Sequence, residues 1–165
     1  MEALRAGTRA PDFALPDMSG NNAGLRELLV RGPVVLAFFK ISCPVCQYAF
    51  PFLQRIYHAA AGKNVAVVGV SQNSQKDTQF FNRQFGITFP ILLDDPRGYK
   101  VSNAYGLTNV PTIFYIAQDG TIEISSVGWN KQDVLEIARR VSEQTQSAAI
   151  QAIAAGEQVA DFRAG

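Results

Sequence analysis

The stretch Val34-Val-Leu-Ala-Phe-Phe-Lys-Ile-Ser-Cys43-Pro-Val-Cys46 decides the fold of this chain. Its first half, 34–39, is a run of β-branched and aromatic residues, which predicts a fully buried strand. Apolar residues then return at helical spacing within 47–61, which predicts a helix. The two cysteines therefore lie where a buried strand passes into a helix.

This position of the cysteines predicts redox chemistry. Backbone N–H groups at a helix N-terminus have no intrahelical partners, so they stabilise a thiolate at Cys43 more than a thiol. Cys43 is the predicted nucleophile, more exposed and more acidic than Cys46. One helical turn later, Cys46 is expected to attack a mixed disulfide on Cys43 and release the partner. We expect the pair to form a reversible intrachain disulfide.

Two other uses of a Cys-X-X-Cys pair are alternatives to this one. A structural zinc site needs four ligands, and the chain has two cysteines and a single histidine, His58. Two buried structural cysteines are the second alternative, but a strand-to-helix turn is not where a core usually places them. We therefore expect a redox pair, with no metal and no cofactor.

Composition sets the broad class of the protein. The 165 residues are 47% hydrophobic, enough for one well-packed domain spanning 1–165, with a core over about 8–145 and a helix extension and tail over 146–165. Fifteen basic and fourteen acidic residues give a net charge of +1, so no nucleic-acid partner is expected. No run approaches transmembrane length, so we expect no membrane partner and a cytoplasmic location, or a periplasmic or secreted one if the sequence is trimmed.

Strand and helix patterns alternate along the chain. Asp119-Gly120 is a hairpin signal between two of the strands. Asn130 caps a long last helix whose apolar positions recur as far as Ala152, and Gly156 to Gly165 is expected to be a loose tail. The expected strands are 11–18, 34–39, 65–71, 89–93, 112–117 and 121–127. The other expected helices are 25–30, 44–61, 74–85 and 95–105. The helix over 95–105 is expected to be capped by Asp95, with Pro96 at its first position.

This order of elements resembles the thioredoxin fold. The resemblance rests on the dithiol after the first core strand, on Pro51 inside the following helix, and on Val110-Pro111-Thr112 ahead of a hairpin. It implies a three-layer α/β/α architecture with a central mixed sheet. It also implies that the Val110–Pro111 bond is cis and faces the dithiol.

The middle of the chain narrows the resemblance. The helix and short strand within 74–93 are similar to the insertion of the redoxin branch, and the opening Ala10-Pro-Asp-Phe-Ala-Leu15 resembles the start of that branch. Its members are peroxiredoxins of the alkyl hydroperoxide reductase and thiol-specific antioxidant type and related thiol–disulfide oxidoreductases. The resemblance thus implies an oxidoreductase, with two chemistries to choose between.

The peroxiredoxin pattern Pro-X-X-X-Thr-X-X-Cys fits this chain imperfectly. When the last cysteine of the pattern is aligned with Cys46, Cys43 stands in place of the threonine and Phe39 in place of the proline. The arginine that activates peroxide in peroxiredoxins would fall near Pro111. Thiol–disulfide exchange is therefore the predicted activity, and a thiol-dependent peroxidase using the same cysteines is the alternative. A third alternative is a redox-sensing or scaffold protein without turnover. The implied partners are protein or small-molecule disulfides and a thiol reductant, with peroxides under the alternative.

Four residues complete the predicted site. Pro111 lacks an N–H and leaves neighbouring backbone free, so Val110, Pro111 and Pro44 are expected to bind an extended partner beside the sulfurs. Lys40 is a candidate for favouring thiolates electrostatically. The buried acid of thioredoxins is replaced by Ala37, and the glutamate of related oxidoreductases is missing from Gln72-Asn-Ser74, so no obvious base for Cys46 is expected.

Overall fold

In the computed structural model, which describes residues 2–165, strand β3 (Val34–Phe39) is the central strand of a five-stranded sheet. All six of its residues are buried, as predicted. β3 runs parallel to one neighbour and antiparallel to the other, so the sheet is mixed. The order across the sheet is β5 (Ile91–Leu93), β4 (Ala66–Ser71), β3, β6 (Thr112–Ile116) and β7 (Ile122–Val127).

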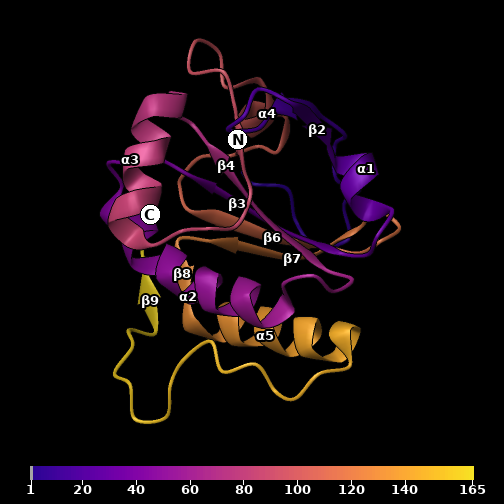
Figure 1. The fold of residues 1–165 in the computed structure, drawn as a ribbon, viewed down its shortest axis with the longest axis vertical. Coiled ribbons are helices and arrows are strands. Elements are labelled where there is room, and N and C mark those ends of the chain that lie inside the picture. The colour runs from indigo at the N-terminus through magenta and orange to yellow at the C-terminus, as the bar shows by residue number, and fades with distance from the viewer. Residues whose placement is uncertain (1) are drawn as a thin grey trace.

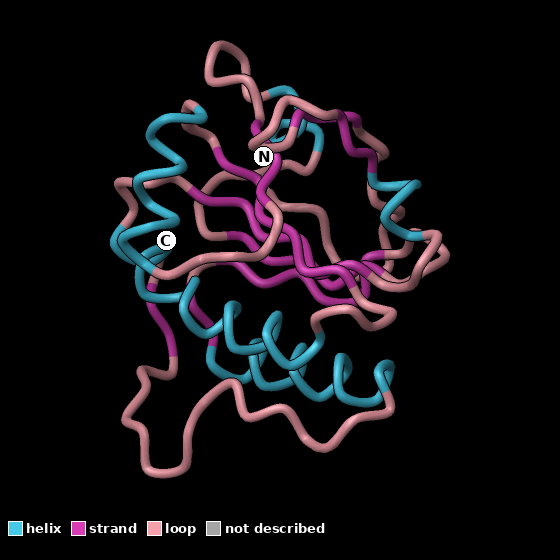
Figure 2. Tube along the Cα trace, viewed as in Figure 1, coloured by secondary structure: helices cyan, strands magenta, loops and turns pink. Residues whose placement is uncertain are grey.

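Helices cover both faces of this sheet. Figure 1 shows α2 (Pro44–Ala60) and α5 (Lys131–Thr145) on one side, and α1 (Leu25–Leu29) and α4 (Lys100–Ala104) on the other. Between β4 and β5 the chain forms α3 (Gln75–Phe85), which packs against α2 and is the predicted insertion. Figure 2 shows the strands enclosed between the two helical layers. The predicted three-layer α/β/α fold is confirmed.

The side chains of β3 divide the core into two parts because successive residues of a strand point to opposite faces. Val35, Ala37 and Phe39 belong to the cluster that contains α2 and α5. Their neighbours, with Leu36 and Phe38 among them, belong to the cluster on the face of α1 and α4. The continuous apolar run of β3 is therefore needed to supply both cores.

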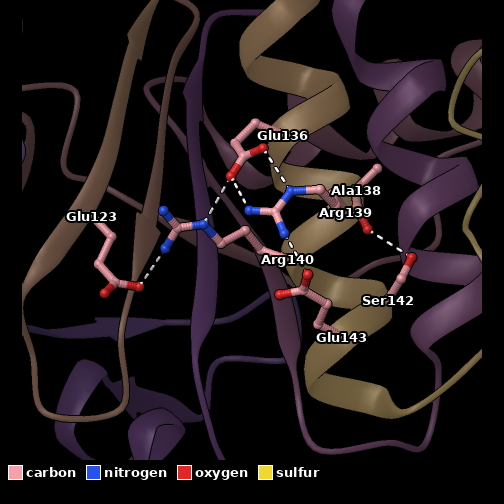
Figure 3. A network of polar contacts seen from close by, with 7 residues as sticks. All are labelled: Glu123, Glu136, Ala138, Arg139, Arg140, Ser142 and Glu143. Atoms are coloured by element: carbon pink, nitrogen blue, oxygen red, sulfur yellow. Dashed lines mark hydrogen bonds and ion pairs between the residues drawn. The ribbon is translucent and has the colours of Figure 1, made fainter.

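Two arginines of α5, Arg139 and Arg140, form ion pairs that stabilise the helix (Figure 3). Arg139 pairs along the helix with Glu136 and Glu143. Arg140 pairs with Glu136 at 3.1 Å and also reaches Glu123 on β7 at 2.8 Å. Its guanidinium lies 5.8 Å from the ring centroid of Tyr115 on β6. Arg140 therefore ties α5 to the sheet, whereas Arg139 acts within the helix.

Two short strand pairs lie outside the main sheet. β1 (Ala14–Pro16) pairs with β2 (Asn22–Gly24), so the strand expected over 11–18 is shorter than predicted. β8 (Trp129–Asn130) pairs with β9 (Phe162–Arg163). Within residues 2–165, no helix has the length and apolarity needed to cross a membrane.

The predicted helix extension and loose tail at 146–165 are wrong. α5 ends at Thr145, because Gln146 adopts the left-handed conformation (φ 52°) and its N–H bonds back to the last turn. The hydroxyl of Ser142 then accepts the N–H of Ile150 at 2.9 Å, which holds the chain in a non-helical path. Ala152, the last apolar position of the expected helix, is instead completely buried in the core cluster beside α2 and α5.

The helix predicted over 95–105 is also shorter than expected. Residues 96–98 form a turn in which the Asp95 carbonyl accepts the N–H groups of Gly98 and Tyr99. The carboxylate of Asp94, rather than that of Asp95, accepts the N–H groups of the first turn of α4. Asp94 is 1% exposed, so this capping role depends on burial that the local sequence does not indicate.

Candidate active site

Cys43 is the N-cap residue of α2. Its backbone is extended (φ −85°, ψ 113°), and Pro44 occupies the first helical position. The N–H of Cys46 donates a hydrogen bond to the Cys43 sulfur at 3.2 Å. This bond confirms the prediction that the helix N-terminus directs a backbone N–H at this sulfur.

The two thiols differ in exposure. Cys46 is completely buried, whereas Cys43 is partly exposed, as predicted. Burial raises the pKa of the Cys46 thiol, and the hydrogen bond between the two cysteine side chains raises it further. Cys43 is thus the sulfur that a partner can reach, and Cys46 is held as a thiol beneath it.

The Val110–Pro111 peptide bond is cis and lies beside the dithiol, as predicted. The Cys43 thiol donates to the Val110 carbonyl oxygen at 3.4 Å. Pro111 directly precedes β6, which pairs with β3, and this pairing brings a segment from residue 110 to a sulfur at residue 43.

A cavity of about 460 Å³ opens beside Cys43 and gathers most of the predicted residues. Lys40, Pro44 and Val110 line it, whereas Pro111 is buried behind them. The Lys40 ammonium lies 5.5 Å from the ring centroid of Tyr99. No carboxylic acid and no arginine is found among the described residues that line this cavity.

Side-chain hydrogen bonds hold the loop that leads into the dithiol. The Ile41 N–H donates to the amide oxygen of Asn73 at 3.0 Å, and the Ile41 carbonyl accepts from the Gln47 amide at 2.9 Å. Asn73 follows the end of β4, so the loop is fixed to the neighbouring strand of the sheet. The sequence pattern gave no sign of this role.

Gln72 occupies the wall of the cavity where related oxidoreductases were expected to carry a glutamate. Its amide donates to the Ser102 hydroxyl at 2.9 Å, and that hydroxyl donates to the buried Asp94 carboxylate at 2.7 Å. An amide cannot act as a base near neutral pH. Gln72 therefore supplies no base at this position of the cavity wall.

Several residues that line the cavity were not predicted, among them Tyr99, Asn109 and Gly165. Tyr99 adopts the left-handed conformation (φ 48°), which is uncommon for a bulky residue. Asn109 and Gly165 lie beside Val110, and the Asn109 amide donates to the Gly165 carbonyl at 3.1 Å. Gly165 is far from the dithiol along the chain, so no local signal could have placed it there.

Comparison with known proteins gives a consistent result. The AhpC/TSA family model matches residues 6–125. A curated relative, the thiol-disulfide oxidoreductase ResA of Halalkalibacterium halodurans, is 34% identical over 134 residues, which cover 80% of this chain and 74% of that protein.

Two solved structures share the fold. A Chlorobium tepidum protein provisionally assigned as the thiol:disulfide interchange protein DsbE has a TM-score of 0.75 and 27% identity, with 87% of this chain and 99% of that chain covered. The peroxidoxin BcpB of Mycobacterium tuberculosis has a TM-score of 0.67 and 21% identity, with 87% and 97% covered. The fold alone is therefore common to proteins named for either chemistry, so the residues of the site must discriminate.

Proposed function

The chain belongs to the AhpC/TSA family, and we propose that within this family it is a thiol–disulfide oxidoreductase in which Cys43 and Cys46 form the redox pair. One observation carries the assignment of the two residues. Cys43 is a partly exposed sulfur at the start of α2, bonded to the Cys46 N–H, and Cys46 is completely buried in the turn behind it. This arrangement suits an attacking sulfur and a resolving sulfur.

The proposed reaction has two steps. The Cys43 thiolate attacks one sulfur of a partner disulfide, which forms a mixed disulfide and releases the other partner sulfur as a thiolate that takes up a proton. Cys46, after losing its proton, attacks the Cys43 sulfur, so that the Cys43–Cys46 disulfide forms and the second partner thiol leaves. Two electrons pass from the dithiol to the partner, and a thiol reductant restores the dithiol by the reverse steps.

The other predicted residues have supporting roles in this proposal. Val110, Pro111 and Pro44 bind the partner beside the Cys43 sulfur, which the hydrogen bond from Cys43 to the Val110 carbonyl supports. Lys40 lies in the same cavity and contributes positive charge there. The partners are protein or small-molecule disulfides and a thiol reductant.

The peroxidase alternative has less support from the site. A peroxide-reducing cysteine needs donors that polarise the peroxide, and the described lining of the cavity contains no arginine. In the register that makes Cys46 the attacking residue, the sulfur is completely buried and its pKa is raised. Both features oppose attack on a peroxide by Cys46.

The expected cytoplasmic location has no support from the comparisons. We propose the periplasmic or secreted alternative, because disulfide-bonded partners persist in oxidising compartments. Fractionation of cells that express the full-length protein tests this point.

A paired kinetic experiment tests the proposed activity. The reduced protein is mixed with insulin and, separately, with hydrogen peroxide, and both rates are followed by stopped flow. We expect disulfide reduction that is lost in Cys43→Ser, and peroxide consumption no faster than that of a simple thiol. Fast peroxide turnover without insulin reduction would establish the peroxidase instead.

Trapping tests the roles of the two cysteines separately. Cys46→Ser should accumulate a mixed disulfide on Cys43, because the resolving sulfur is gone. The matched variant Cys43→Ser should trap no partner. If Cys43→Ser is the variant that traps partners, the roles of the two residues are reversed.

A further inference from the structure

The chain after α5 is held firmly against the body of the protein. From α2, Arg55 donates to the Ala152 carbonyl at 2.9 Å and pairs with Glu157 at 2.6 Å. Ala152 is completely buried. In Figures 1 and 2 this part of the chain runs back beside α5 and rises as β9 next to β8. The fold thus returns its last residues to the end of the molecule that carries the dithiol.

The last six residues, 160–165, which we call the β9 segment, contain the short strand β9. Phe162 and Arg163 pair antiparallel with β8, and the Asp161 carbonyl accepts the N–H of Lys131 at 2.9 Å. The indole N–H of Trp129 donates to the Ala160 carbonyl at 2.6 Å, and the Ala160 N–H donates to the Tyr48 hydroxyl at 3.1 Å. Backbone groups therefore make most of these contacts.

The β9 segment ends against the cis-proline loop. A side chain at Gly165 would place its Cβ 2.3 Å from the Val110 carbonyl oxygen, so backbone touches backbone there. That oxygen is the same one that accepts the Cys43 thiol. A side chain at Gly128, where φ is +75°, would likewise place its Cβ 2.5 Å from the Arg163 carbonyl oxygen. Glycine at both positions is what allows this close approach.

We propose that the β9 segment occupies the strand position of the protein partner, so that an extended, flexible polypeptide segment must displace it to reach Cys43. This inference rests on the proposed function and adds the class of its substrate. A partner strand would pair with β8 through its backbone and pass Val110 with a small residue. The guanidinium of Arg163 lies 4.2 Å from the ring centroid of Tyr48. A cationic residue of the partner would fit in the place of this guanidinium.

The contacts of the β9 segment suit a strand that can leave. β9 has only two paired residues, and Phe162 is 59% exposed. Buried anchors such as Ala152 precede this segment, and Ala160 at its start packs against the core, so release of the exposed residues 161–165 leaves these packed residues in place. An extended partner would regain the same backbone hydrogen bonds, whereas a small disulfide needs none of them.

The test compares a large and a small substrate in the full-length protein. The double variant Arg163→Ala with Gly165→Ala removes the contact with Tyr48 and introduces a clash with the Val110 carbonyl. Ala164→Ser is the matched control, because the exposed Ala164 side chain lies between them. We expect the ratio of insulin reduction to reduction of the small disulfide 5,5′-dithiobis(2-nitrobenzoic acid) to rise severalfold in the double variant and to stay unchanged in the control.

Hydrogen exchange reports the position of the segment independently of activity. The Lys131 amide, bonded to Asp161, should exchange faster in the double variant. While insulin is displacing the segment from Cys46→Ser, the Lys131 amide should also exchange faster. Once the trapped partner strand lies in place of the segment, this amide should be protected again, whereas the amides of 161–165 should stay unprotected.

Each other outcome overturns one proposal. Protected amides at 161–165 in the trapped complex, or a substrate ratio that does not rise once the segment is released, would show that the partner binds elsewhere. Failure of every form of the protein to reduce either substrate would overturn the proposed activity itself.

Discussion

At the scale of single residues, Cys46 couples the stability of the protein to pH. Its pKa is raised by burial, so the folded protein keeps the thiol protonated where the unfolded chain ionises. This contribution is fully present below the unfolded thiol pKa of about 8.5 and is lost as pH rises above it. We expect the reduced protein to lose up to about 1.4 kcal/mol of unfolding free energy per pH unit in that range from this residue.

Urea unfolding at pH 7.5 and pH 10, with the thiols kept reduced, measures this effect. Cys46→Ala is the control, because it cannot ionise, and its stability should fall less over the same interval. Burial also raises the pKa of Tyr105 and Tyr115, so both proteins should lose some stability at the upper end. Equal losses in the two proteins would contradict the prediction.

At the scale of elements, Asp94 holds α4 beside the active-site cavity. Its carboxylate accepts the N–H groups of Val101 and Ser102 and the Ser102 hydroxyl, at 3.2, 2.8 and 2.7 Å. Removing a buried charged acceptor leaves these donors unsatisfied, so Asp94→Ala should cost about 3 kcal/mol of unfolding free energy. Chemical denaturation measures this loss.

The neighbouring aspartate provides the control. Asp95 pairs with Arg97 on the surface, and the Arg97 side chain is 91% exposed. Asp95→Ala should therefore be much less destabilising than Asp94→Ala. Similar losses for the two variants would contradict the assignment of the cap to Asp94, and a larger loss for Asp95→Ala would support the cap that the sequence predicted.

Arg140 and Arg139 offer a second comparison at this scale (Figure 3). Arg140 joins α5 to β7 through Glu123 and packs over Tyr115, so Arg140→Ala should cost about 1 kcal/mol. Arg139 pairs only within its helix among the described contacts, so Arg139→Ala should cost less and respond more to salt. Thermal unfolding at low and high salt ranks the two variants, and an Arg139 variant at least as unstable would contradict the assignment.

At the scale of the whole molecule, Trp129 joins the β9 segment to the core. The indole is completely buried, and its ring centroid lies 5.2 Å from that of Tyr48. Trp129→Phe removes the hydrogen bond to Ala160 and leaves unfilled volume, so it should cost about 2 kcal/mol of unfolding free energy. Tyr48→Phe removes only the hydroxyl that accepts from the same residue, so its cost should be smaller.

A double-mutant cycle on these two residues tests whether they act together. Because both hold Ala160, the double variant should lose less stability than the sum of the two single variants. Unfolding followed by circular dichroism suits this test, since Trp129 is the only tryptophan of the chain. Strict additivity would mean that the two contacts are independent.

The sequence by itself determined the parts of this protein that depend on local pattern. The apolar run of β3, the helix after Cys43 and the Asp119-Gly120 hairpin each follow from neighbouring residues, and all are found. The cis Val110–Pro111 bond was expected from the resemblance to the thioredoxin fold and is present. Together these predicted the two thiols, their relative exposure and the loop beside them.

Tertiary structure decided what depends on residues far apart in the chain. Helical spacing continued to Ala152, but α5 ends at Thr145, and Ala152 reaches the core beside α2 and α5 along a non-helical path that leaves Ala148 and Ala149 exposed. The capping of α4 by Asp94 depends on that buried position. The approach of Gly165 to Val110 joins residues 55 positions apart through backbone contacts, and backbone contacts leave no pattern of side chains for a sequence to display.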